Sequence, residues 1–337
     1  MTVEIGTGSI PGFPHIYPVE EQLRFLLRYA ILAPSTRNTQ PWRFAVDGNR
    51  VLVRADLTRG HPVADDDRRE LYLSLGCALE NLLVAAEQLG FRCSVVYQPH
   101  APDEQVAAAI AFLPGGHRSP ERAALSVETI VARRAAHGRF SRQPISGEDR
   151  LALERCATDT GVELTFVVDP EIRLAVGQLH RKAHDIALAD PAFRQELAGW
   201  IGEGAFGTPW PFSRIGGLAV GNEAVACQLA KLDAMALESS PLLALISSRH
   251  DDRPAQVMSG QLLERVWLTA TSRELGLQPL SAALEVPELR ARLTALTGAP
   301  LPWAQQLVRI GHPRKRSGHR TPRRPIDAVI DPAERGA

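Results

Sequence analysis

The chain has 337 residues, 45% of them hydrophobic, and its 38 basic side chains balance its 38 acidic ones. This length suggests about two domain-sized cores, and zero formal net charge argues against a general binder of nucleic acids. The sequence has neither a signal-peptide pattern at its start nor a run of about 18 uncharged apolar residues. Its cysteines are scattered, as expected of reduced thiols: Cys77, Cys93, Cys156 and Cys227. We therefore expect a cytoplasmic, globular protein that binds neither nucleic acid nor membrane.

Helical and strand-like patterns alternate along the chain. Helical periodicity predicts helices at about 19–33, 69–89, 147–160, 171–189, 221–238, 257–275 and 287–297. Residues that stop a helix mark four of the ends: Pro34, Gly90, Gly161 and Gly276. Strand-like runs cover residues 43–56, 93–98, 108–113, 163–169, 242–248 and 305–311. The first run predicts a hairpin that turns at Asp47-Gly48.

Part of this pattern occurs twice, on either side of an internal boundary at residues 113–123. The run "LLVAAEQLGFRCSVV" (82–96) has a weaker echo in "LTATSRELGLQPLSA" (268–282), in which Gly276 matches Gly90. Likewise, "RFAVDG" has a counterpart in "TFVVDP". Any helix–glycine–strand unit produces such matches, and so does a fused pseudo-dimer, whose two lobes would form a ligand cleft between them.

One glycine-rich motif lacks the context that its function needs. "GEGAFG" (202–207) satisfies G-x-G-x-x-G, but Thr208, Pro209, Trp210 and Pro211 follow it, so that no helix opens there to bind a dinucleotide. The wider run at 199–217 is predicted to be a long mobile loop of the kind that serves as a lid.

Two further charged motifs are interpreted as surface features. His180 and His184 share one helix face at a spacing that could hold a metal, but no third ligand is evident, and an exposed face is the interpretation we favour. "ADDDRRE" (64–70) predicts a capped, solvated helix start with acidic groups near the helix dipole.

Two basic clusters are candidates for binding an anion: "ARRAAHGRF" (132–140) and "HPRKRSGHRTPRRP" (312–325). Either could be a solvated face, and the second a disordered tail. However, Pro322 and Pro325 hold the arginines between them in stiff backbone, and fixed guanidinium groups suit a phosphate, which they bind bidentately.

The stretch "ILAPSTRNTQPWRF" (31–44) joins a helix end to an irregular polar loop. Pro34 stops the helix, and small or amide side chains follow before Pro41 and Trp42. This is either an ordinary surface loop or a ligand-binding loop, whose amides would match the edge of a heteroaromatic ring. In the second case Trp42 would bury its indole to fix the loop.

Three of these segments resemble motifs of the FMN-binding nitroreductase family. "APSTRNTQPWRF" resembles the family's A-P-S-x-x-N-x-Q-P-W signature, "ETIVARRAAHGRF" its R-R-x-x-R phosphate segment, and "VRIGHP…TPRRPIDAVI" its C-terminal ending. The resemblance covers residues from about 20 to 330 and is to the fused, single-chain Acg-type branch. It implies an α+β, nitroreductase-like fold with two pseudo-symmetric, helix-flanked antiparallel or mixed sheets. The first half would comprise residues 1–120 and the second half 121–337.

The resemblance also implies that FMN lies between these halves. The first half would contribute loop residues: Ser35, Thr36, Asn38 and Gln40. The second half would bind the phosphate and the ribityl chain: Arg133, Arg134, His137, Arg139, Arg320, Arg323 and Arg324. The "QPLS" turn would bring its backbone to the flavin N5 with three residues: Pro279, Leu280 and Ser281. No catalytic side chain and no metal ligand is predicted.

Departures from the family pattern qualify these expectations. Ala135 stands where Ser or Thr is common, and His137 stands where Arg is common. His137 would make FMN affinity fall as pH rises through its pKa, near 6.5 if unperturbed. The halves do not repeat these motifs, so the mirror-image site would lack its partners. We therefore expect one FMN per chain, in a monomeric pseudo-dimer.

Two functions of different classes follow from the resemblance. In the first, hydride passes from NAD(P)H to FMN and on to a nitro-aromatic or quinone-type acceptor, and the cofactor carries the chemistry. In the second, the protein sequesters or stores FMN, and the lid over the flavin, as in the Acg-type branch, leaves little or no turnover.

Overall fold

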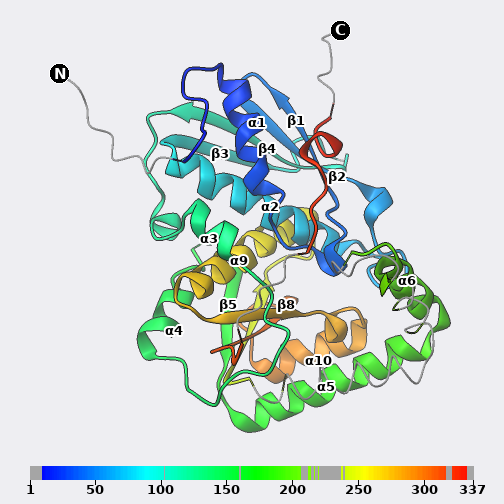
Figure 1. Cartoon of the computed structure of the whole chain (residues 1–337). Coiled ribbons are helices and arrows are strands. Elements are labelled where there is room, and N and C mark those ends of the chain that lie inside the picture. Colours follow the sequence, from blue (N-terminus) through cyan, green and yellow to red (C-terminus); the bar gives the residue numbers. More distant parts are fainter. Residues whose placement is uncertain are drawn as a thin grey trace.

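The computed structural model describes residues 10–101, 103–158, 161–205, 240–315 and 321–331, with residues 212, 213, 216, 219 and 237. In this part of the chain, helices and two four-stranded antiparallel sheets form two lobes, and two central helices lie between the sheets (Figure 1). The predicted α+β class is confirmed. No helix in the described ranges combines the length and the apolar character needed to cross a membrane.

The first sheet has the strand order β1-β2-β4-β3. Its strands are β1 (Trp42–Asp47), β2 (Arg50–Ala55), β3 (Phe91–Tyr97) and β4 (Val106–Pro114). The predicted hairpin is confirmed, because β1 pairs antiparallel with β2 and Gly48 in their turn has a φ of 54°. Two helices belong to this lobe: α1 (Val19–Ala30) and α2 (Arg69–Gln88).

The second sheet repeats this topology, with the order β5-β6-β8-β7. Its strands are β5 (Val162–Val167), β6 (Leu242–Ser248), β7 (Gly276–Leu280) and β8 (Trp303–Gly311). The helices of this part are α3 (Val127–Ala132), α4 (Gly147–Glu154), α5 (Pro170–Ala189), α6 (Pro191–Gly202), α9 (Arg253–Ser272) and α10 (Pro287–Thr297). Identical strand orders confirm the internal repeat that the two sequence echoes indicated.

Some predicted elements differ from the structure. The "QPLS" segment, expected as a turn, is mostly strand β7, with only Ser281 beyond its end. The matched glycines Gly90 and Gly276 differ in conformation: Gly90 has a φ of 80°, whereas the left-handed residue after α9 is Glu274, with a φ of 58°. The helix predicted at 221–238 lies outside the described residues, except for Leu237.

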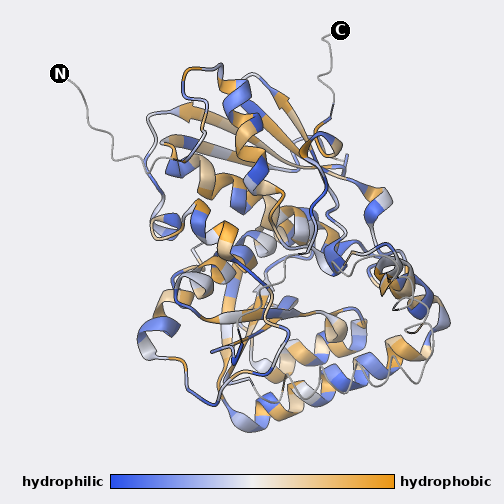
Figure 2. Ribbon diagram, viewed as in Figure 1, coloured by the Kyte–Doolittle hydropathy of each residue, from blue (hydrophilic) through white to orange (hydrophobic). Residues whose placement is uncertain are grey.

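The two central helices cross at a pair of glycines. A Cβ on Gly76 of α2 would lie 2.0 Å from the Val257 carbonyl oxygen, and a Cβ on Gly260 of α9 would lie 2.0 Å from that of Leu73. The contact is therefore the same in both directions, as at a two-fold dimer interface. Every residue of α2 is buried, which agrees with a helix packed on all sides. By contrast, the peripheral α5 alternates hydrophilic and hydrophobic residues (Figure 2).

Each end of the second half's chain pairs with the edge strand of a sheet. Near the C-terminus, Ile330 pairs parallel with Phe44 at the outer edge of β1, with Asp331 N donating to Phe44 O over 2.7 Å. After α3, Ala135 pairs parallel with Leu277 of β7. These crossings bring the predicted binding segments to the same region of the molecule.

Candidate functional site

The loop after α1 has a constrained backbone that its own side chains help to hold. Arg37, Asn38 and Gln40 have φ values of 49°, 56° and 54°, a left-handed conformation that asparagine tolerates better than the other two. Ser35 Oγ accepts a hydrogen bond from Gln40 N over 2.9 Å. Trp42 is fully buried at the start of β1, which confirms the prediction that its indole is buried directly after the loop.

The loop amides bind the C-terminal segment in this structure. Asn38 Nδ2 donates to Pro322 O over 3.0 Å, and Gln40 Nε2 lies 3.4 Å from the same oxygen. In return, Arg324 N donates to Gln40 Oε1 over 2.8 Å. Both amide side chains are buried, so they join the two halves of the chain at this point.

Two arginines from distant segments converge on the end of α1. Arg133 Nη2 donates to Leu32 O over 2.9 Å, and Arg323 Nη2 donates to the same oxygen over 3.1 Å. Arg323 also donates to Ala33 O (3.2 Å) and, through Nη1, to Asn38 Oδ1 (3.0 Å). Three segments that are far apart in the sequence thus meet around the loop: its own residues, the start of the R-R segment and the C-terminal arginines.

Arg133 and Arg324 have different partners. Arg133 is 6% exposed, lies over the Trp267 ring at 4.5 Å, and has its Nε 3.3 Å from Glu264 Oε1. Arg324 Nη1 contacts Gln40 O and Asp56 Oδ2, each over 3.2 Å, so this side chain fastens the C-terminal segment to the loop.

The remaining predicted residues of the R-R segment lie further out. Arg134 Nη1 donates to Val131 O (2.7 Å) and Arg133 O (2.5 Å) at the end of α3, while His137 and Arg139 are exposed. Arg320 lies outside the described residues. The assignment of these four side chains to a phosphate stays a prediction.

Arg309, which the sequence analysis did not single out, holds the R-R segment against β7. It is fully buried in β8 and donates through Nη2 to Ala136 O (2.7 Å) and Gly138 O (2.9 Å). Its Nε donates to Gln278 Oε1 over 2.8 Å. An arginine in the middle of an otherwise buried strand was the signal in the sequence, because such a charge needs several partners.

The residues predicted to contact the flavin N5 lie at the end of β7, which leads toward the loop. Pro279 and Leu280 end the strand, and Ser281 precedes a short 3-10 helix, η4 (Ala282–Leu284). The next residue, Glu285, pairs with Arg37 of the loop at 3.6 Å. This segment therefore reaches the loop at Arg37, whereas the C-terminal arginines contact it at other residues, among them Asn38 and Gln40.

Carboxylates gather beneath the loop at the start of α2. Thr36 Oγ1 donates to Glu70 Oε2 over 2.8 Å, and Asp65 caps the helix by accepting from Glu70 N and Leu71 N. The capping is confirmed, but the prediction of a solvated helix start holds only for Asp66, Asp67 and Arg68, which are exposed, whereas Asp65 and Glu70 are buried. Burial, together with the charge of Glu70, raises the pKa of both Asp65 and Glu285. A pocket of about 150 Å³ opens beside Asp65 and Glu285.

Helix α6 covers the loop from the second half. Glu196 Oε1 lies 3.5 Å from Arg37 Nη1, whose guanidinium stands 5.0 Å from the Phe193 ring. Beyond the helix, Ala205 O accepts from Asn38 Nδ2 over 2.7 Å. The run at 199–217, predicted as a loop, begins as helix up to Gly202, and most of its remainder lies outside the described residues. Because a helix precedes "GEGAFG", the rejection of a dinucleotide motif is confirmed.

The two histidines on α5 do not form an exposed face, which corrects our interpretation. His180 is 2% exposed, and its Nε2 lies 3.1 Å from His184 Nε2. Burial, with a contribution from His184, lowers the pKa of His180 to about 3, so that this imidazole is neutral. In the described part of the chain, no third His, Cys, Asp or Glu joins them to form a metal site.

Fold and contacts together define an α+β pseudo-dimer in which loop amides and arginine guanidinium groups meet where its halves join. Among curated proteins, the chain is 26% identical over 334 residues to "Putative NAD(P)H nitroreductase Rv3131" of Mycobacterium tuberculosis, covering 94% of this chain and 92% of that protein. It is also 26% identical over 331 residues to "Putative NAD(P)H nitroreductase acg" of the same organism, covering 94% and 97%. The chain is thus related to the Acg-type proteins over most of its length, as predicted. No protein-family model matches it.

Solved structures overlap with only part of the chain. A BluB-like flavoprotein from Clostridium difficile has a TM-score of 0.44 at 15% identity, covering 61% of this chain and 98% of its own. An FMN-bound nitroreductase from Desulfitobacterium hafniense has a TM-score of 0.42 at 17% identity, covering 61% and 98%. Each overlap extends over less than two thirds of the pseudo-dimer.

Proposed function

We propose that this chain binds one FMN between its halves and acts as an NAD(P)H-dependent oxidoreductase of the nitroreductase type. The observation that carries the proposal is the meeting of Arg133 and Arg323 at Leu32 O, beside the amide-bearing loop. The names of the relatives, which describe NAD(P)H nitroreductases, support the same reading.

The donor set suits a flavin nucleotide. Guanidinium groups and exposed cationic residues of the R-R segment supply positive charge, and Asn38 and Gln40 supply both donors and acceptors. Among the described residues, Arg133 Nε is buried without a hydrogen-bond partner, although it is ion-paired. Arg323 and Arg324 already contact the loop, so in the holoprotein they would both close the site and face the anion.

FMN, when bound, would supply hydride transfer, which no side chain of the site performs. The chain would contribute positioning and exclusion of water. Arg309 would keep the R-R segment against β7, and α6 would cover the loop from solvent. We assign no proton-transfer step to a particular side chain. The electron acceptor that we propose is a nitro-aromatic or quinone-type molecule.

A second candidate, FMN storage without turnover, is favoured by one observation. Helix α6 contacts Arg37 of the loop through Glu196 and Phe193, and Ala205 after the helix accepts a hydrogen bond from Asn38, so that the loop is covered in this structure. A cover of this kind would keep a nicotinamide from the flavin unless it moved.

The first experiment loads the purified chain with FMN, removes free flavin, and adds NADH or NADPH without oxygen. Rapid loss of visible flavin absorbance supports the reductase, whereas reduction by dithionite alone supports storage. Absence of bound flavin would overturn both.

A second experiment tests the cover. Glu196→Ala removes the contacts to Arg37 and to the Val63 amide, and should speed reduction by nicotinamide if α6 is the barrier. Gln195→Ala, on an exposed position of the same helix, is the matched control and should leave the rate unchanged. Equal rates of flavin reduction in both variants would contradict the idea that α6 is a barrier to the nicotinamide.

A further inference from the structure

Two fully buried glutamates occupy matching places on the central helices. Glu80 of α2 and Glu264 of α9 each lie four residues after the glycine of the helix crossing, and each is 0% exposed. The residue that follows each glutamate in the sequence donates a hydrogen bond to the glutamate of the other helix. Arg265 Nε donates to Glu80 Oε1 over 3.0 Å, and Asn81, with its amide oriented to satisfy both ends, donates to Glu264 Oε1 over 2.9 Å.

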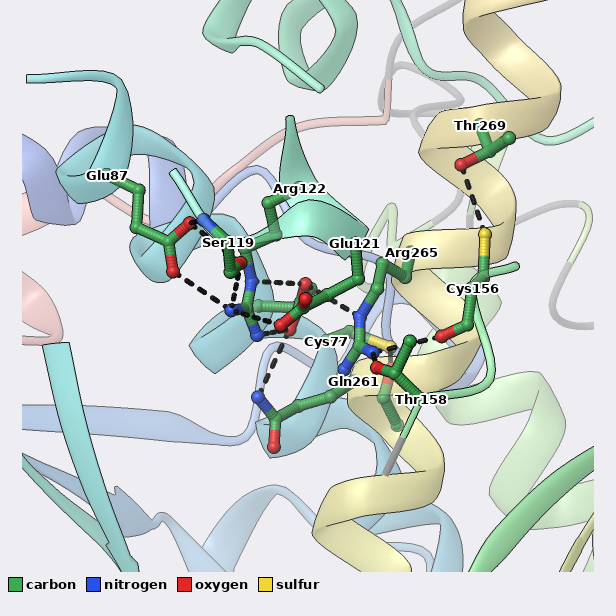
Figure 3. Close-up of polar contacts among 12 residues, drawn as sticks. Cys77, Glu87, Ser119, Glu121, Arg122, Cys156, Thr158, Gln261, Arg265 and Thr269 are labelled. Atoms are coloured by element: carbon green, nitrogen blue, oxygen red, sulfur yellow. Dashed lines mark hydrogen bonds and ion pairs between the residues drawn. The ribbon is translucent and has the colours of Figure 1, made fainter. Parts of the chain in front are cut away.

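Both carboxylate oxygens of Glu80 accept two hydrogen bonds each, and the donor residues Arg122, Arg265 and Gln261 are labelled in Figure 3. Its Oε1 accepts from Arg122 Nε over 2.7 Å in addition to Arg265, and its Oε2 accepts from Arg122 Nη2 (2.9 Å) and Gln261 Nε2 (3.1 Å). Burial opposes ionisation here, but Arg122 and Arg265 outweigh it and lower the pKa of Glu80 to about 2. Glu80 is therefore ionised at every physiological pH.

Glu264 has far fewer donors. Arg133 Nε stands 3.3 Å from its Oε1, and its Oε2 has no hydrogen-bond partner among the described residues. Burial, the largest effect, raises the pKa of Glu264 to about 7, although Arg133 lowers it. The other groups that act on this carboxyl are Glu80, which raises its pKa, and Arg323 and Asn81, which lower it. Burial, with the charge of Glu264, raises the pKa of the Cys77 thiol well above its usual value.

We propose that Glu264 is a positioning residue for Arg133 that takes up a proton when an anionic ligand binds beside Arg133. This inference rests on the proposed function, because the ligand it considers is FMN. In the free protein, the carboxylate holds Arg133 by an ion pair. A phosphate would compete for that guanidinium, and protonation of Glu264 would release it while Asn81 and the Trp267 ring keep both side chains in place.

The linkage has a definite sign. A negative ligand near Glu264 disfavours its ionised form, so the pKa of Glu264 rises further in the complex. Between the free and bound pKa values, binding transfers one proton from solvent to the Glu264 carboxylate, and no other bond changes. FMN affinity should therefore fall as pH rises above about 7, by up to about tenfold per pH unit, the limit for one linked proton.

The test measures FMN dissociation constants between pH 7 and pH 9 by quenching of flavin fluorescence. This window lies above the phosphate pKa of about 6, so the ligand keeps its charge. Glu264→Gln should flatten the dependence and bind FMN more tightly than the natural chain at pH 9. The matched control is Glu87→Gln, at another buried glutamate of α2, which should retain the slope, and His137→Asn should retain it as well.

A measurement on the natural chain covers the case in which a glutamate variant does not fold. Calorimetric titration with FMN at pH 8, in two buffers of different ionisation enthalpy, should report net proton uptake. No uptake, or an undiminished slope in Glu264→Gln, would overturn the inference while FMN binding itself survives. Loss of the pH dependence in His137→Asn would assign the proton to that imidazole instead. That result would also overturn the inference. FMN that does not bind at any pH would overturn the proposed function.

Discussion

Buried side chains with many contacts decide the geometry of the site at the scale of single residues. Trp42 could be identified from the sequence, because an indole after an irregular polar loop has few roles other than anchoring it, and it is fully buried. Arg309 could be recognised as an arginine within a buried strand, but its role could not be predicted, because strand periodicity does not show which carbonyl groups the side chain will meet. Its partners come from residues 136–138 and 278, and only the folded chain brings them together.

Replacing Arg309 by lysine should therefore be costly despite the conserved charge. A lysine presents one ammonium group and cannot reach Ala136 O, Gly138 O and Gln278 Oε1 together. We expect a loss of about 2–4 kcal/mol in the free energy of unfolding, measured in urea, since buried acceptors are left without donors. Arg150→Lys, on an exposed position of α4, is the control and should change stability by less than about 0.5 kcal/mol. An equally small effect at Arg309 would contradict the role assigned to it.

At the scale of elements, strand β7 shows why one segment was misassigned. The resemblance implied a turn at "QPLS", but this segment lies mostly in β7, an edge strand of the described sheet, and edge strands tolerate proline. Gly276 is needed for packing, because a Cβ there would lie 2.7 Å from that of Ala136 in the R-R segment. By contrast, β6 was predicted with its observed bounds, because a continuous apolar run at the centre of a sheet leaves no ambiguity.

The crossing of α2 and α9 yields a prediction at the same scale. Gly76→Ala would place a methyl group 2.0 Å from a backbone oxygen, and neither helix can yield without moving its sheet. We expect the free energy of unfolding to fall by about 3 kcal/mol or more. Gly199→Ala in α6, where nothing lies within 4 Å, should instead be neutral or stabilising by up to about 1 kcal/mol. Similar unfolding curves for the two variants would contradict close packing at the crossing.

At the scale of the whole molecule, the repeat creates two related places, one around Glu80 of α2 and one around Glu264 of α9. The side chains that surround the two glutamates differ. The glutamate of the first is neutralised by two arginines, and the glutamate of the second shares a single arginine with the loop region. The sequence analysis predicted an asymmetry in the binding motifs, which the two halves do not share, but not the difference between the two glutamates. It could not predict that Arg122 fills the first place, because that contact joins residues that are distant in the chain and follow no pattern.

The most direct test of this account is the number of flavins that the chain retains. After incubation with excess FMN and gel filtration, absorbance of flavin and protein should give one FMN per chain, because only one of the two related places carries both the loop amides and the R-R segment. A Ser35→Trp variant, which fills the loop, should lose that flavin. A protein that emerges without flavin, or with two per chain, would contradict the proposal that a single FMN lies where the two halves meet.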